Sequence, residues 1–159
     1  MATLTGAEAY VIREATHEDL PRVIELLHSS SLPTAGVAEA LSGFLVAERE
    51  GSIIGSVGIE SCGDRVALLR STAVRDEWRG RGLGRRLVER AIAAAKADGV
   101  DALYLLTTTA ERYFPSFGFE RVERSDVPEA VRATEEFSSA CPATASVMAL
   151  QLSASRDRR

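Results

Sequence analysis

A strand–helix–strand pattern in the middle of the chain limits its fold more than any other feature. The apolar run VALLRSTAV at 66–74 predicts a buried strand, and VDALYLLTTT predicts a second one over 102–109. Residues 82–98 between them have the apolar spacing of a helix that ends at Gly99. Strands joined in this way form a parallel crossover within one sheet. The pattern therefore predicts an α/β layer fold.

Segments on either side of this unit predict further strands and helices of the same sheet. The additional strands are expected at 10–14, 44–50 and 52–61, after Gly118, and at 144–152. The additional helices are expected from an N-cap at Thr16 to Ser30, at 110–117, and over 128–137. A mixed central sheet with helices on both faces follows from this order.

Composition and length limit the class of protein. The 159 residues predict one domain over 1–152, followed by a disordered tail over 153–159. A net charge of -4 argues against a general nucleic-acid binder. Cys62 and Cys141 are too few for a zinc ribbon or a disulfide framework, so no metal site is expected. We find no apolar run of membrane-spanning length and no signal peptide, and we expect a cytoplasmic protein. A homodimer is left open.

The segment RGRGLGRR at 79–86 is a basic turn between the predicted strand and helix. A helix N-terminus offers free N–H groups to phosphate, and glycines let the backbone approach it. The spacing matches neither the dinucleotide fingerprint nor the P-loop. It indicates diphosphate binding, and the alternative is a tight turn with a solvated basic rim.

These motifs resemble a known family. Arg79-x-x-Gly82-x-Gly84, together with the Gly118-Phe119 turn, resembles the GNAT N-acetyltransferases. The resemblance implies acetyl-CoA as cosubstrate and a GNAT fold whose central parallel strands splay apart. It also implies that a backbone N–H near Thr72 polarises the acetyl carbonyl. The cofactor-binding residues that it implies are Thr72, Ala73, Val74, Arg79, Gly80, Arg81, Gly82, Leu83, Gly84 and Arg85.

A narrower resemblance concerns the acceptor. The segments SLPTAGV, ALLRSTAV, LYLLTTTA, TEEF and CPATA resemble the N-acetyltransferases associated with arsenic-resistance operons. That group implies a small, amino-acid-like amine as acceptor, in arsenic or xenobiotic detoxification. Two alternatives stay open: acetylation of protein N-termini or lysines, and a non-catalytic coenzyme A sensor on the same fold.

The catalytic acid and base are less clear from the sequence. In many family members a tyrosine at the position of Phe114 acts as the general acid. Its neighbour Tyr113 is therefore the candidate acid here, and the alternative is that Tyr113 only packs against other residues. The strand at 66–74 has no carboxylate, which makes Glu60 the nearest candidate base. If residues 58 and 68 pair approximately, strand alternation places Glu60, Arg70 and Thr72 on one face.

Arg70 is a cation within an apolar strand and needs an anionic partner there. It is the candidate to bind the acid end of the acceptor, with Glu60 as the one fixed partner expected from the sequence; the alternative is an ion pair between these two residues. The segments 31–37, which contains Thr34, and 132–142 are the expected lids, and we assign Arg70, Glu60 and Thr34 to the acceptor site.

Overall fold

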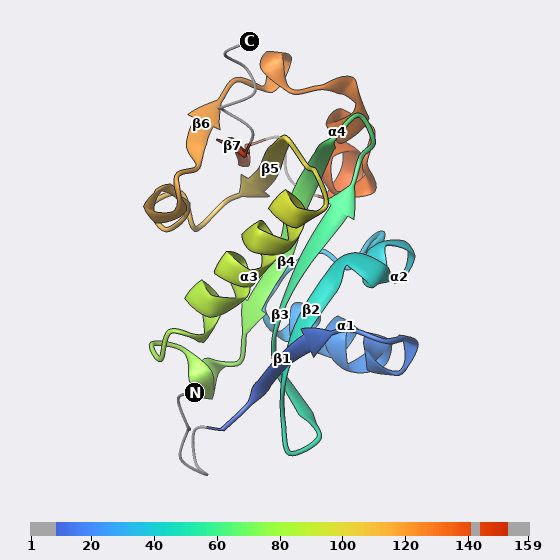
Figure 1. Cartoon of the computed structure of the whole chain (residues 1–159), viewed down its shortest axis with the longest axis vertical. Helices are drawn as coiled ribbons and strands as arrows, with labels where there is room; N and C mark the ends of the chain where they lie inside the picture. The colour runs from blue at the N-terminus through green and yellow to red at the C-terminus, as the bar shows by residue number, and fades with distance from the viewer. Residues whose placement is uncertain (1–8, 141–143, 153–159) are drawn as a thin grey trace.

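The computed structural model describes residues 9–140 and 144–152, which form one mixed seven-stranded sheet with helices on both faces (Figure 1). The strands are β1 (Val11–Glu14), β2 (Phe44–Arg49), β3 (Ser52–Ser61), β4 (Val66–Val74), β5 (Ala102–Thr107), β6 (Glu120–Val122) and β7 (Ser146–Gln151). The α-helices are α1 (Leu20–Ser29), α2 (Val37–Ala40), α3 (Leu83–Ala97) and α4 (Glu129–Arg132). Short helical turns are η1 (His17–Asp19), η2 (Leu41–Gly43), η3 (Asp76–Trp78), η4 (Phe114–Phe117), η5 (Arg124–Asp126) and the π-helical η6 (Glu136–Ala140).

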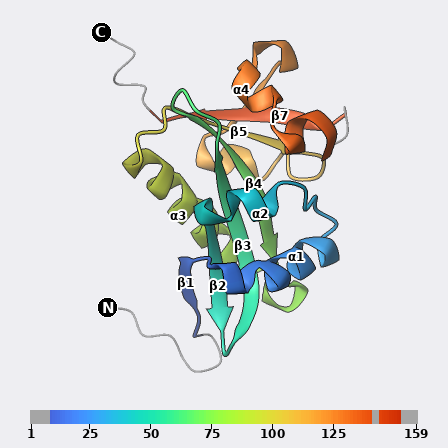
Figure 2. The same cartoon turned by 90° about the vertical axis from the view of Figure 1, so that its right-hand side faces the viewer.

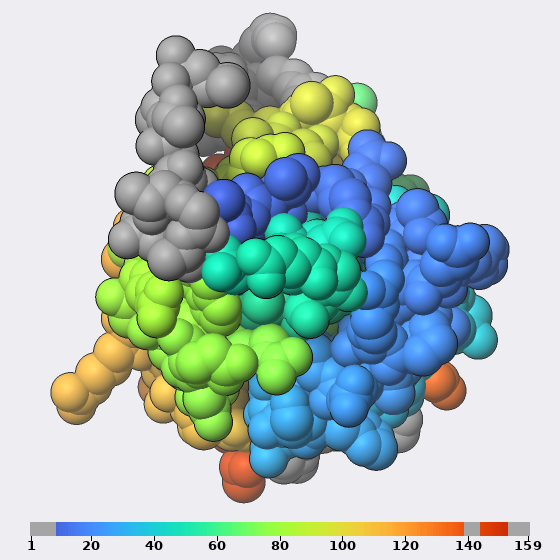
Figure 3. Space-filling view, turned by 90° about the horizontal axis from the view of Figure 1, so that it is seen from below, coloured from blue at the N-terminus to red at the C-terminus, as the bar shows by residue number. Residues whose placement is uncertain are grey.

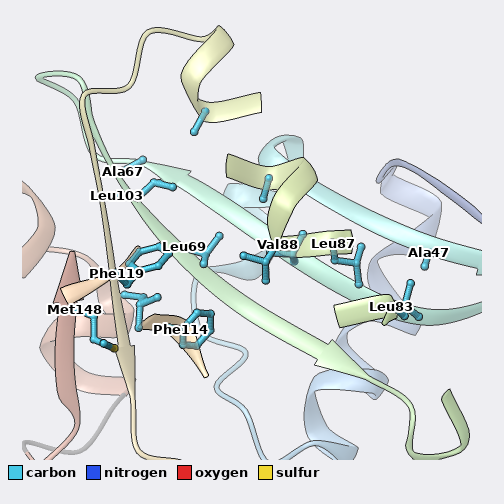
Figure 4. Packing of buried hydrophobic residues seen from close by; sticks show 14 of the residues in the cluster. Ala47, Ala67, Leu69, Leu83, Leu87, Val88, Leu103, Phe114, Phe119 and Met148 are labelled. Atoms are coloured by element: carbon cyan, nitrogen blue, oxygen red, sulfur yellow. The ribbon is translucent and has the colours of Figure 1, made fainter. Parts of the chain in front are cut away.

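The helices cover the sheet from two sides (Figure 2). On one side α3 packs Leu83, Leu87 and Val88 against the central strands, and the same cluster takes in Phe119 and Met148 (Figure 4). On the other side α1 packs against β2 and β3, and α4 packs against β4, β5 and β7. The expected fold class is therefore confirmed. The expected tail at 153–159 and Cys141 lie outside the described residues.

The parallel crossover is present, and its two strands separate. The sheet order is β1-β2-β3-β4-β5-β7-β6, with β4 and β5 as its parallel pair. Pairing between them ends at Leu68 and Tyr104, although β4 continues to Val74 and β5 to Thr107. Beyond that point β5 pairs with β7 on its other edge, while the facing edge of β4 has no strand partner within the described residues. The expected splay of the central strands is confirmed.

The register between β3 and β4 corrects the sequence expectation. Glu60 pairs with Leu68, and Gly58 pairs with Arg70 rather than with residue 68. A β-bulge follows, since the next pair is Ser56 with Ala73. One residue of β3, Val57, thus faces two of β4, Ser71 and Thr72, which reverses the alternation beyond the bulge. The expectation that Thr72 continues the face of Arg70 is therefore wrong.

The structure also differs from the single helix expected over 128–137, which is two shorter helical pieces instead. α4 ends at Arg132, and the wide π-helical turn η6 begins only at Glu136. Between them the Thr134 hydroxyl donates to the carbonyl of Val131 (2.8 Å) and accepts from the N–H of Phe137 (3.3 Å). A threonine side chain that bonds the backbone in this way competes with the regular helical ladder.

Candidate active site

A cavity of about 560 Å³ occupies the gap where β4 and β5 separate. Residues 69–72 of β4, residues 105–110 at the end of β5, and the loop residues 31–33 line it. Tyr113, Phe114, Glu136 and Ala145 complete its wall. Both segments expected as lids, 31–37 and 132–142, thus contribute residues to the cavity.

The glycine turn forms the N-terminus of α3. Gly80 and Gly82 both have a left-handed backbone, with φ of 77° and 85°, and a Cβ added to either meets no atom within 4 Å. The first paired N–H of the helix is that of Arg86, which donates to the carbonyl of Gly82 (3.1 Å). Among the described residues, the backbone N–H groups of Leu83, Gly84 and Arg85 have no recorded partner. An open backbone surface with free donors fits a diphosphate.

The arginines of the turn brace it. Arg79 Nε donates to the carbonyl of Val74 (3.1 Å), which ties the turn to the end of β4. The Arg81 guanidinium lies over the Trp78 ring (4.6 Å), and the Arg85 guanidinium lies over the Phe117 ring (4.6 Å). Seen from below, the segment 75–86 (green) lies at the surface beside the β2–β3 hairpin (Figure 3). The turn is therefore both a structured element and an accessible one.

The bulge in β4, at Ser71 and Thr72, forms part of the cavity wall. Ser71 has a left-handed backbone (φ 60°), which is uncommon for a residue other than glycine. The buried Ser56 Oγ donates to the carbonyl of Ser71 (2.8 Å) and helps to hold it. Thr72 follows directly and has no ladder partner on β3. Strain of this kind is common at functional sites, and here it occurs between Arg70 and Thr72, the two residues of this strand that the sequence singles out.

Tyr113 and Phe114 occupy different environments. Phe114 is 7% exposed and belongs to the core cluster under α3 (Figure 4). Tyr113 is 37% exposed, lines the cavity, and brings its hydroxyl to 3.4 Å from where a Cβ of Gly84 would lie. Burial raises the pKa of Tyr113. Tyr113 is therefore beside the glycine turn, and its role as the acid stays a prediction.

Arg70 is buried within a set of fixed partners. It is 2% exposed, and its Nη1 donates to Glu60 (2.9 Å) while its Nη2 donates to the carbonyl of Ala35 (2.7 Å). Its Nε lies 3.1 Å from Ser71 Oγ and 3.2 Å from Glu136 Oε1. The ion pair with Glu60 left open by the sequence is present. The expectation that Glu60 is the one fixed partner is wrong, because Glu136 is a second.

Glu136 is the site residue that sequence reasoning missed. It is 4% exposed and comes from η6, more than sixty positions along the chain from Arg70. Burial raises its pKa to about 7, against the opposing effect of Arg70 and with a further rise from Glu60. The available signal was Arg70 itself, since a buried guanidinium has five donors and one carboxylate cannot satisfy them all.

Other expected residues lie away from this cavity. Thr34 precedes α2, where its carbonyl accepts from Val37 N–H (3.2 Å), and it does not line the gap. Glu60 lines a different cavity of about 690 Å³ near the C-terminal end of α3, beside Ala94 and Gly99. That cavity is larger but lies far along α3 from the glycine turn. In the part of the chain that the structure describes, no group of three or more His, Cys, Asp or Glu could hold a metal ion.

Comparison with known proteins identifies the family. A family model described as the acetyltransferase (GNAT) domain matches residues 40–121, more than half of the chain. The match includes β2, β3, β4, the glycine turn, α3, β5 and η4. The chain belongs to the GNAT acetyltransferase family.

Named relatives agree with this assignment. An uncharacterized N-acetyltransferase of Chlorobaculum tepidum is 33% identical over 95 residues, which are 60% of this chain and 61% of the relative. An amino-acid acetyltransferase of Pseudomonas fluorescens is 32% identical over 139 residues, covering 80% of this chain and 32% of the relative. The chain thus spans less than two thirds of either protein.

A solved structure has the same fold. N-acetylglutamate synthase from Neisseria gonorrhoeae, complexed with coenzyme A and N-acetyl-glutamate, superposes with a TM-score of 0.78 at 20% identity. The match covers 91% of this chain and 35% of that one. Among the described residues, no helix is long and apolar enough to cross a membrane.

Proposed function

We propose that this chain is an acetyl-CoA-dependent N-acetyltransferase that transfers acetyl directly to the amine of a small, amino-acid-like acceptor. The observation that carries the proposal is the open edge of β4 beyond Leu68, which leads from the free N–H groups of α3 into the cavity. An extended amide-bearing arm can pair with a free strand edge while its diphosphate rests on the helix N-terminus.

The geometry supports a role for each part of the site. The turn at 79–85 would hold the diphosphate, and Thr72, Ala73 and Val74 would pair with the pantetheine arm. The backbone N–H of Thr72, freed from the ladder by the bulge, would polarise the thioester carbonyl. Tyr113 is proposed as the group that protonates the leaving thiolate, because it lines the cavity beside Gly84.

The acceptor class rests on similarity. Curated relatives are called amino-acid acetyltransferases, and the structural neighbour from Neisseria gonorrhoeae holds N-acetyl-glutamate. We therefore propose an amino acid or a close analogue as the acceptor, in the cytoplasm. The link to arsenic or xenobiotic detoxification is a finer proposal that rests on the sequence resemblance alone.

An amine screen tests the proposed function. Release of free thiol from acetyl-CoA is measured with L-amino acids, their phosphinate and arsonate analogues, aliphatic amines, and peptides with free N-termini. We expect turnover with amino-acid-like amines and little with peptides. Faster turnover with peptides would indicate a protein acetyltransferase. Binding of acetyl-CoA without turnover of any amine would indicate a coenzyme A sensor.

A further inference from the structure

Glu136 is the one carboxylate among the described residues that line the gap between β4 and β5. The sequence candidate, Glu60, lines the other cavity. An amine that enters the gap to meet a thioester there therefore encounters Glu136 rather than Glu60.

Glu136 lies beside the part of β4 where acetyl transfer is expected to take place. Its Oε1 lies 3.2 Å from Nε of Arg70, the residue directly before the bulge. Ser71 and Thr72, which form the bulge, line the same cavity as Glu136. The carboxylate is thus beside the strand segment whose freed backbone N–H is proposed to polarise the thioester carbonyl.

The charges around Glu136 favour binding of a cationic group. Arg70 is the one cationic residue lining the cavity in the described chain, and it is paired with two carboxylates. When both carboxylates are ionised, the cluster carries a net charge of about -1, since one guanidinium offsets only one of them. An ammonium group would therefore be attracted to Glu136, while an anionic group would find no unpaired cation at Arg70.

The ionisation of Glu136 suits proton transfer near neutral pH. Its pKa is raised to about 7 by burial, with Arg70 lowering it and Glu60 raising it. Besides Arg70, Tyr113 is the other titratable group on the cavity wall among the described residues. A base whose pKa lies near the working pH combines a useful ionised fraction with proton affinity.

We propose that Glu136 is the general base of the transferase, a role that rests on the proposed function. Its carboxylate takes one proton from the acceptor ammonium and later releases it to solvent. The neutral amine then forms a C–N bond with the thioester carbonyl carbon, and the C–S bond breaks. The remaining excess proton on nitrogen ends on the coenzyme A sulfur, so the products are the amide, free coenzyme A and one proton.

The kinetic test compares the two carboxylates that share Arg70. Glu136→Gln and Glu60→Gln each remove one of them, and rates are measured from pH 5.5 to 9 with L-glutamate and n-propylamine as amine probes. We expect wild-type kcat to rise through about pH 7. Glu136→Gln should lose this rise and roughly 10²-fold or more in kcat, while Glu136→Asp keeps the rise at a lower rate. Glu60→Gln should also keep the rise, at a somewhat lower pH, because the charge of Glu60 raises the pKa of Glu136.

Two kinetic outcomes would overturn the assignment. Loss of the pH-dependent rise in Glu60→Gln, with the rise kept in Glu136→Gln, would make Glu60 the base. Equal loss in both variants, together with equal loss of thermal stability, would mean that the carboxylates only hold Arg70 in place.

A second measurement is independent of turnover. The carboxyl carbons of ¹³C-glutamate-labelled protein bound to coenzyme A are titrated by NMR, with the Glu136 signal assigned by its absence from Glu136→Gln or Glu136→Asp. We expect a midpoint near 7 and a shift on adding n-propylamine. A midpoint near 4.5, without a shift, would rule out Glu136 as the base. Failure of coenzyme A to bind would instead contradict the proposed function.

Discussion

At the scale of single residues, two glycines offer a matched test of the proposed diphosphate site. Gly82 is the N-cap residue of α3 with φ 85° and Gly63 lies in the β3–β4 turn with φ 80°, and a Cβ at either meets no atom within 4 Å. Alanine at either position has the same unfavourable left-handed backbone, at a cost of roughly 1–2 kcal/mol in unfolding free energy.

We expect only Gly82→Ala to weaken acetyl-CoA binding, by about 10-fold in Kd or ~1.4 kcal/mol, because its Cβ occupies the surface proposed for the diphosphate. Calorimetry measures affinity and thermal melting measures stability. Equal affinities for the two variants and the wild type would contradict the cofactor site.

Arg70 offers a second test at the residue scale. Its guanidinium donates to Glu60, Ser71 and Ala35 at once and is fully buried. Lysine keeps the charge but cannot reproduce this planar set of donors. We expect Arg70→Lys to lower the unfolding free energy by ~2 kcal/mol or more, and to change KM for acidic and neutral acceptors alike. A selective rise in KM for acidic acceptors, with an unchanged melting temperature, would instead indicate that Arg70 binds the acceptor.

At the scale of elements, Asp19 joins β1 to α1. It is 1% exposed, accepts two bonds from Arg13 of β1 (2.8 and 2.9 Å), and pairs with Arg22 of α1 (2.8 Å). Its carboxylate also accepts from Thr16 N–H (2.7 Å), as in a capping box. The sequence predicted a helix start at Thr16 but gave no sign that Asp19 would be buried by Arg13.

We expect Asp19→Asn to lower the unfolding free energy at pH 7 by about 1.5–3 kcal/mol, because the buried carboxylate loses its charge-assisted hydrogen bonds from Arg13 and Arg22, whose own side chains are partly exposed. Hydrogen bonds from Arg13 hold the pKa of Asp19 well below its usual range. The stabilisation is therefore fully present above the unfolded pKa of about 4 and is lost as pH falls toward the folded value. Glu18→Gln, at an exposed position in the same turn, is the control and should change stability little. Urea unfolding at pH 7 and pH 3 measures both variants.

At the scale of the whole molecule, two parts of the sheet meet through a short parallel seam. β1 to β4 form one antiparallel part, and β5, β7 and β6 form the other. Three pairs, between Val66–Leu68 and Ala102–Tyr104, join them. The separation beyond this seam creates the cavity, and segments far apart in the sequence, 31–33, 108–113 and Glu136, complete its wall.

The sequence by itself determined the features that depend on local patterns. Apolar runs placed the strands, Gly99 and Gly118 marked the ends of helices, and the arginine–glycine turn marked the start of α3. These signals are local, because the spacing of apolar residues and the backbone freedom of glycine act over a few neighbouring positions.

Only the tertiary structure decided what surrounds Arg70. The bulge at Ser71 reverses the alternation of β4, and the Thr134 hydroxyl interrupts a predicted helix so that Glu136 lies in the wall of the cavity. Neither event has a strong local signal, since regular alternation and a continuous helix were the simpler expectations. The pairing of Glu136 with Arg70 joins residues from distant segments. Its energy depends on burial and distance in the folded state, which the order of residues along the chain does not specify.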